Sequence, residues 1–243
     1  MTASKPRIAL VGSGQMGSLH ARVIAQSALC ELDLLIEPRE EQGKAVAARF
    51  DTRWAADFDS LDGIDAVVIA AATPAHYELA GRVLDLGKPV LVEKPLAATY
   101  EQSVDLVDRS RAAGVPLMCG LLERFNPAVR TAREFSGDVW QVNGIRHSPF
   151  VSRIPTGVAT DLLIHDIDLA IGFAGSEPSL AKGVRLLPSD VRAEPVGGLR
   201  RRRIALRIRG CCNDFREPNQ SAQDPPAVVA RGRSTHRDRS LAS

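Results

Sequence analysis

The stretch that decides the fold lies near the start of the chain: Arg7-Ile8-Ala9-Leu10-Val11-Gly12-Ser13-Gly14-Gln15-Met16-Gly17. Its first five residues form the short apolar run of a buried parallel strand. The glycines fit G-x-G-x-x-G, and a proline-free helical pattern follows from Ser18 to Ala28. Gly12 permits a tight turn, Gly14 lets backbone approach a pyrophosphate, and Gly17 allows close helix–strand packing. The N–H groups at the start of the helix then face the phosphates.

A second strand is predicted from Leu32 to Glu37. Glu37 stands twenty residues after Gly17, where an acid accepts hydrogen bonds from the adenosine ribose hydroxyls of a dinucleotide. A carboxylate there repels a 2′-phosphate, so NAD is the expected cofactor. Arg39 leaves NADP open, because a guanidinium pairs with phosphate or stacks on adenine.

Strands and helices alternate as far as residue 120, which is typical of βαβ units around a parallel sheet. Residues 1–120 are therefore predicted to form an α/β domain with a doubly wound Rossmann sheet. The further helices are expected at Glu40–Phe50, Ala75–Leu86 and Glu101–Ala113, and the further strands at Asp65–Ala71, Val90–Val92 and Val115–Gly120.

One of these strands ends abruptly in Val90-Leu91-Val92-Glu93-Lys94-Pro95. Proline cannot donate to a sheet, so the strand must stop where the charges begin. Lys94 is therefore expected at the carboxyl end of a strand, where open α/β sheets bind ligands. A lysine that reaches this place by chance is the alternative.

The pattern changes after residue 120, and residues 121–182 are expected to form an incomplete α+β domain. A strand is predicted at Asp138–His147 and a helix at Val158–Phe173. On that helix Asp161 and His165 are four residues apart and share one face, where a carboxylate orients an imidazole for general acid–base chemistry. A helix surface with one satisfied histidine is the plainer alternative. The spacing of cysteines and histidines indicates no metal site.

Residues 183–243 are expected to form a disordered basic tail, with 13 arginines, no lysine and six acids. A strand at 199–208 is compatible with the pattern but has no evident partner. This composition resembles GC-rich DNA translated in another frame, which suggests a second domain interrupted near 176–183. A nucleic-acid-binding arm is the other reading, but Phe215 is the tail's only aromatic residue, so stacking on bases has little support.

The composition sets the broad class. A hydrophobic content of 44% in 243 residues is enough for a packed core. The longest uncharged run, Ala66–Tyr77, is too short to span a bilayer, and no apolar signal region precedes the first strand. Four cysteines without C-x-x-C spacing predict a reducing, cytoplasmic setting.

Three motifs now stand in order: the glycine motif, Glu93-Lys94-Pro95, and Asp161-x-x-x-His165-Asp166-x-Asp168. Together they closely resemble the Gfo/Idh/MocA family of NAD(P)-dependent sugar and cyclitol oxidoreductases. The segment Thr73-Pro74-Ala75-His76 resembles that family's cofactor-side loop. Leu122–Pro127 is similar to a segment of members that act on UDP-N-acetylglucosamine-type substrates. The resemblance covers residues 6 to about 178.

The resemblance implies hydride transfer between the nicotinamide and a ring carbon that bears a hydroxyl group. Lys94 would hydrogen-bond the reacting hydroxyl, His165 would move its proton, and Asp161 would orient the substrate or the imidazole. Arg124 and Asn126 would contact the substrate or its diphosphate, with a helix-start role as the alternative for Asn126.

The resemblance also implies a cofactor set and a usual quaternary state. Members of the family are longer and form homo-oligomers through a second-domain sheet, which is expected to be cut short here. The alternative function is a non-catalytic dinucleotide-binding remnant. The expected cofactor contacts are Gly12, Gly14, Gln15, Met16, Gly17, Glu37, Arg39, Thr73, Pro74, His76, Glu93 and Lys94.

Overall fold

The computed structural model describes residues 4–137, 139, 141–149, 159–175 and 201–209. The chain divides into two compact units, Met1–Leu121 and Leu122–Ser243.

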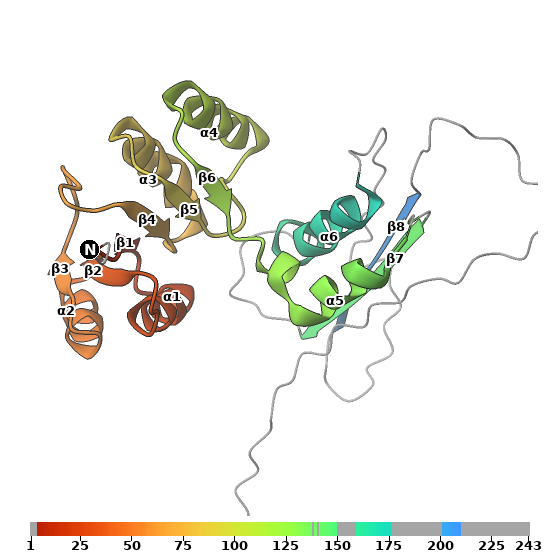
Figure 1. Ribbon diagram of the computed structural model, residues 1–243, viewed down its shortest axis with the longest axis horizontal. Helices are drawn as coiled ribbons and strands as arrows, with labels where there is room; N and C mark the ends of the chain where they lie inside the picture. The colour runs from red at the N-terminus through yellow and green to blue at the C-terminus, as the bar shows by residue number, and fades with distance from the viewer. Residues whose placement is uncertain (1–3, 138, 140, 150–158, 176–200, 210–243) are drawn as a thin grey trace, which may run out of the picture. The chain divides into compact units, whose positions relative to one another are not determined.

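The first unit is a six-stranded parallel sheet with the strand order β3-β2-β1-β4-β5-β6 (Figure 1). This order confirms the predicted doubly wound Rossmann sheet. The strands are β1 Arg7–Val11, β2 Glu31–Ile36, β3 Arg53–Ala55, β4 Ala66–Ile69, β5 Val90–Val92 and β6 Leu117–Cys119. The helices are α1 Gln15–Ala25, α2 Glu40–Arg49, α3 Thr73–Asp85 and α4 Tyr100–Ala113.

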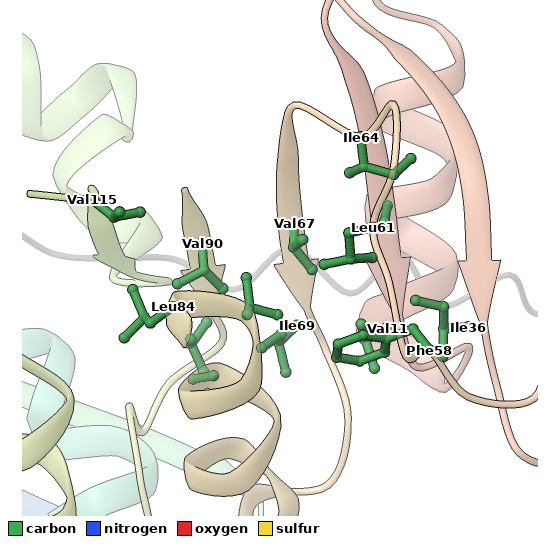
Figure 2. Packing of buried hydrophobic residues seen from close by; sticks show 14 of the residues in the cluster. Val11, Ile36, Phe58, Leu61, Ile64, Val67, Ile69, Leu84, Val90 and Val115 are labelled. Atoms are coloured by element: carbon green, nitrogen blue, oxygen red, sulfur yellow. The ribbon is translucent and has the colours of Figure 1, made fainter. Parts of the chain in front are cut away.

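Two apolar layers cover the two faces of this sheet. Successive strand residues point to opposite faces, so Leu10 joins the layer under α1 and α2, whereas Ala9 and Val11 join the layer under α3 and α4. Figure 2 shows the second layer, in which side chains of the central strands meet Leu84 of α3 and Phe58 of the loop before β4. The sheet is therefore buried on both faces, as a parallel sheet requires.

Local signals set several element boundaries. The helix α4 begins where the Thr99 hydroxyl oxygen accepts a hydrogen bond from the Gln102 N–H at 3.2 Å, and it ends at Gly114, whose φ is 63°. The helix α3 begins at Thr73, two residues before the predicted start, because Pro74 needs no partner for an N–H in the first turn. The helix α1 begins at Gln15 rather than at Ser18.

The second unit combines short helices with one antiparallel strand pair. The helix predicted at Val158–Phe173 divides into two elements, a π-helical turn and an α-helix. A strand near the one expected at 199–208 is present and pairs with β7, a partner that the sequence pattern did not reveal. The elements are η1 Leu122–Phe125, α5 Pro127–Phe135, β7 Gln141–Pro149, η2 Ala159–Leu163, α6 Ile164–Ala174 and β8 Arg201–Arg209.

The rest of the predicted tail and the proposed interruption near 176–183 lie outside the described residues. Within the described part of the chain, no helix has the length and apolar character needed to cross a membrane.

Candidate cofactor and active site

The glycine turn after β1 is fitted to its neighbours by close backbone contact. Gly12 has a φ of +95°, and a Cβ there would lie 2.7 Å from the carbonyl oxygen of Ala70. A Cβ on Gly17 would lie 2.0 Å from the carbonyl oxygen of Gly12. Both positions therefore exclude any side chain, and the turn can pack against β4 and α1 only as glycine.

Gly14 has the opposite surroundings. No atom lies within 4 Å of a Cβ built on it, so the backbone of this residue faces open space. Gly14 is also the N-cap of α1, and no side chain accepts a hydrogen bond from the first turn there. The start of a helix with its N–H groups directed to an open space is a ready anion site. The turn thus fits the pyrophosphate of a dinucleotide.

The turn lies where the strand order reverses. The N–H of Gly12 donates to the Ile36 carbonyl in β2 at 2.8 Å, and the N–H of Ala70 donates to the Val11 carbonyl at 2.8 Å. The carboxyl end of β1 is therefore tied to β2 on one side and to the end of β4 on the other. This reversal is where doubly wound sheets bind their ligands.

Glu37 is the acid predicted to contact the ribose, and it is 2% exposed. One carboxylate oxygen accepts from the Ser13 N–H at 2.9 Å and the Ser13 hydroxyl at 2.7 Å. Arg39 donates to both oxygens, from Nε at 2.7 Å and Nη2 at 3.0 Å. Burial acts to raise the pKa of Glu37, but the hydrogen bonds from Arg39 and Ser13 outweigh it and lower that pKa to about 2. The guanidinium that left NADP open is thus paired with the acid that favours NAD.

The cofactor-side loop begins α3, with Thr73 and Pro74 in its first turn. His76 is only 1% exposed and turns into the protein. Its Nδ1 lies 2.8 Å from the Pro95 carbonyl oxygen, and its Nε2 lies 3.0 Å from the Ala71 carbonyl oxygen. Both ring nitrogens therefore lie against backbone carbonyl oxygens, and His76 lies between the loop after β4 and the segment that carries Lys94.

Lys94 follows the end of β5, as predicted, and its peptide bond to Pro95 is cis. Beside it, Glu93 is 6% exposed and lies 2.7 Å from the Nε2 atom of His20. Burial acts to raise the pKa of Glu93, but the hydrogen bond and charge of His20, and then the Lys94 N–H and charge, hold that pKa below its usual value. His20 was not predicted from the sequence. Its only signal is its place on the face of α1 that also carries the buried Gly17 and Ile24.

The second unit carries the other candidate residues. Asp161 lies in the π-helical turn η2 and His165 in the first turn of α6, and both are half-buried. The three predicted catalytic residues are thus divided, with Lys94 in the first unit and the other two in the second.

The two predicted substrate contacts have partners within the second unit. The Arg124 guanidinium donates from Nε to Asp168 at 2.7 Å and makes a second bond through Nη2 to the same carboxylate. Asn126 accepts a hydrogen bond from the Ala128 N–H at 3.0 Å and caps α5. This cap is the helix-start role that the sequence left open.

No group of three or more histidine, cysteine, aspartate or glutamate side chains among the described residues is arranged to hold a metal ion.

Comparison with known proteins gives one family. Residues 6–121 match the model of an oxidoreductase family with an NAD-binding Rossmann fold, Gfo/Idh/MocA. The UDP-N-acetylglucosamine 3-dehydrogenase of Acidithiobacillus ferrooxidans is 30% identical over 175 residues, which are 71% of this chain and 55% of that protein. The inositol 2-dehydrogenase of Corynebacterium glutamicum is 29% identical over 185 residues, 70% of this chain and 54% of that protein.

A solved structure gives the same result. GenD2 from gentamicin A biosynthesis, in complex with NAD, has a TM-score of 0.66 and 25% identity over 73% of this chain and 56% of that protein. The chain therefore spans about half the length of the relatives it matches. Through residues 6–121, which carry the glycine turn, Glu37 and Lys94, the chain belongs to the Gfo/Idh/MocA oxidoreductase family and forms its NAD-binding Rossmann domain.

Proposed function

We propose that this protein serves hydride transfer between a nicotinamide dinucleotide and a hydroxyl-bearing carbon of a sugar, cyclitol or nucleotide sugar. The observation that carries the proposal is the place of Lys94. It follows β5, next but one to β1 in the sheet, so it stands at the same carboxyl edge as the open Gly14 turn. The relatives named as a nucleotide-sugar and an inositol dehydrogenase support the substrate class.

The chemistry assigns a task to each candidate residue. Oxidation of an alcohol needs a base for the O–H proton and a positive charge beside the developing alkoxide. Lys94 supplies the charge, His165 exchanges the proton, as an imidazole does near neutral pH, and Asp161 orients the imidazole or the substrate. The glycine turn and Glu37 would hold NAD, whose nicotinamide would supply the hydride acceptor.

The contacts of Arg124 bear on the choice of substrate. A diphosphate bound at this guanidinium would have to compete with the two hydrogen bonds from Asp168. A free sugar or cyclitol needs no such exchange. The geometry therefore favours a small polyol over a nucleotide sugar.

The test combines binding with turnover on the full chain. NADH binding, followed by fluorescence, is expected to fall at least tenfold in Gly14→Val, because the branched side chain fills the space over the turn. Turnover of a panel of inositols, hexoses and UDP-sugars is expected to fall roughly a hundredfold in Lys94→Ala, with a measurable residue, and to persist in Lys44→Ala. Lys44 pairs with Glu40 at the surface of α2 and serves as the matched control.

Two outcomes contradict the proposal, and a third would favour another reading of the tail. Binding of NADH without turnover of any substrate would indicate a dinucleotide-binding protein that is not catalytic. Turnover that Lys94→Ala leaves unchanged would remove the lysine from the mechanism. Salt-dependent retention on DNA, lost when residues 183–243 are deleted, would favour the nucleic-acid reading.

A further inference from the structure

We propose that His20 is a positioning residue for Lys94 and acts through the carboxylate of Glu93. This proposal rests on the function proposed above, because that function gives Lys94 its catalytic task. It assigns a part in that task to a side chain on the helix of the glycine motif, 73 residues away in sequence from the carboxylate it contacts.

The two oxygens of the Glu93 carboxylate have separate partners. Oε1 lies 2.7 Å from His20 Nε2, and Oε2 accepts a hydrogen bond from the backbone N–H of Lys94 at 3.2 Å. The backbone N–H of Glu93 itself donates to the Ile69 carbonyl at 2.9 Å and so extends the pairing of β5 with β4. The carboxylate therefore links α1 to the residue just beyond the end of β5.

The carboxylate has little room to move. A Cβ on Gly120 would lie 2.9 Å from Glu93 Oε2 and 3.1 Å from the Glu93 Cα. Gly120 is in turn held by the bond from its N–H to the Val92 carbonyl at 2.7 Å. Glu93 thus lies against bare backbone after β6, and His20 meets it from α1.

The burial of Glu93 explains why the loss of His20 would weaken the hydrogen bond that positions the Lys94 backbone. A carboxylate exposed by only 6% has lost most of its water and depends on the partners that the protein supplies. Without the imidazole, Oε1 has lost its hydrogen-bond partner. The protein then lowers its free energy if the carboxylate turns toward water or takes up a proton. Either change weakens its bond to the Lys94 N–H.

The opposite side of Lys94 is held in the same manner. The carbonyl of Pro95, the next residue, lies 2.8 Å from Nδ1 of the buried His76. One histidine comes from α1 and the other from α3, and these helices cover opposite faces of the sheet. The backbone around Lys94 is therefore held from both layers, and the layer of α1 is the one whose helix begins at the open Gly14 turn.

The first experiment measures backbone order without any substrate. Hydrogen exchange of a peptide spanning residues 90–97 is compared in the wild type, His20→Leu and His20→Gln. The glutamine amide nitrogen reaches the place of Nε2, so exchange is expected to rise about tenfold in the leucine variant and to stay within threefold in the glutamine variant. Two controls are expected to match the wild type. The first is exchange of α4 in the His20 variants, and the second is exchange of residues 90–97 in Arg22→Leu, an exposed substitution on α1. Equal exchange at 90–97 in all variants, or equal acceleration in α4, overturns the proposal.

The second experiment uses turnover of the best substrate. His20→Leu is expected to lower kcat at least tenfold while the Kd for NADH changes less than twofold, and His20→Gln is expected to recover most of the loss. In a Lys94→Ala background His20→Leu should cost nothing more, because the two residues act as one unit. An equal loss in both backgrounds would make His20 merely structural. If the wild type turns over no substrate, the proposed function fails, and the exchange result still decides the link from His20 to Lys94.

Discussion

The two units of this chain stabilise their candidate residues in different ways. In the first unit the glycine turn and Lys94 follow strands whose apolar side chains are buried on both faces of a six-stranded sheet. Among the described residues of the second unit, only Val129 and Ala170 are buried apolar side chains. There, Arg124 and Asp168 join η1 to α6 by an ion pair. The cofactor half thus has an extensive buried apolar core, whereas few of the apolar side chains described in the half with His165 are buried.

The largest expected effect tests this difference directly. Ile69→Ala removes a side chain that is 0% exposed in β4 and is expected to lower the free energy of unfolding of the first unit by about 3–4 kcal/mol. Ile167→Ala removes a half-buried side chain in α6 and is expected to cost about 1 kcal/mol. Urea unfolding of both variants measures the pair. Equal losses would mean that the two units share one kind of core.

The next largest effect is the loss of stability at low pH that Glu37 is expected to cause. Glu37 has a folded-state pKa of about 2 against an ordinary value of 4.5, so its contribution of about 3 kcal/mol is complete above the ordinary value and is lost as the pH falls from about 5 to 2. Glu37→Gln is expected to remove this contribution at pH 7 and to flatten the acid limb of the stability curve. Urea midpoints from pH 3 to pH 7 provide the measurement. The exposed Glu40→Gln, which should change the acid limb far less, is the control, and an acid limb as steep in Glu37→Gln as in the wild type would contradict the assignment.

A smaller loss is expected from the ion pair in the second unit. Asp168→Asn removes the charge opposite Arg124 and should cost about 1–2 kcal/mol, since the carboxylate is 9% exposed but the arginine is half exposed. Arg124→Lys keeps the charge and loses the two-point geometry, so its cost should be smaller. Thermal melting followed by circular dichroism in low and high salt compares the two. A loss in Asp168→Asn that is absent at low salt would argue against the ion pair.

The smallest expected effect is the loss of stability when a helix cap is removed, which can be compared between the two units. Thr99→Ala and Asn126→Ala each remove one cap bond and are expected to cost about 1 kcal/mol. Asn126→Ser retains the cap but removes the amide. If this variant keeps its stability and loses turnover, Asn126 contacts substrate in addition to capping α5. If both properties persist, the cap is its whole role.

The sequence revealed features that depend on neighbours along the chain. Gly114 ends α4 and the glycine motif opens α1 as the patterns predicted, since a helix end needs only a few local residues. The contact of His20 with Glu93 and that of Arg124 with Asp168 join residues 73 and 44 positions apart. No periodicity carries such a pairing, and the partner of β8 was missed for the same reason.

The strand order has a consequence for self-association. The outermost strands of the parallel sheet, β3 and β6, are each three residues long, whereas the central β1 has five. An edge strand presents unpaired N–H and C=O groups that can template a foreign strand, and a short edge presents few of them. The sheet therefore ends on both sides in short edges that present few unpaired groups to another chain, which lowers the tendency of this fold to pair edge to edge.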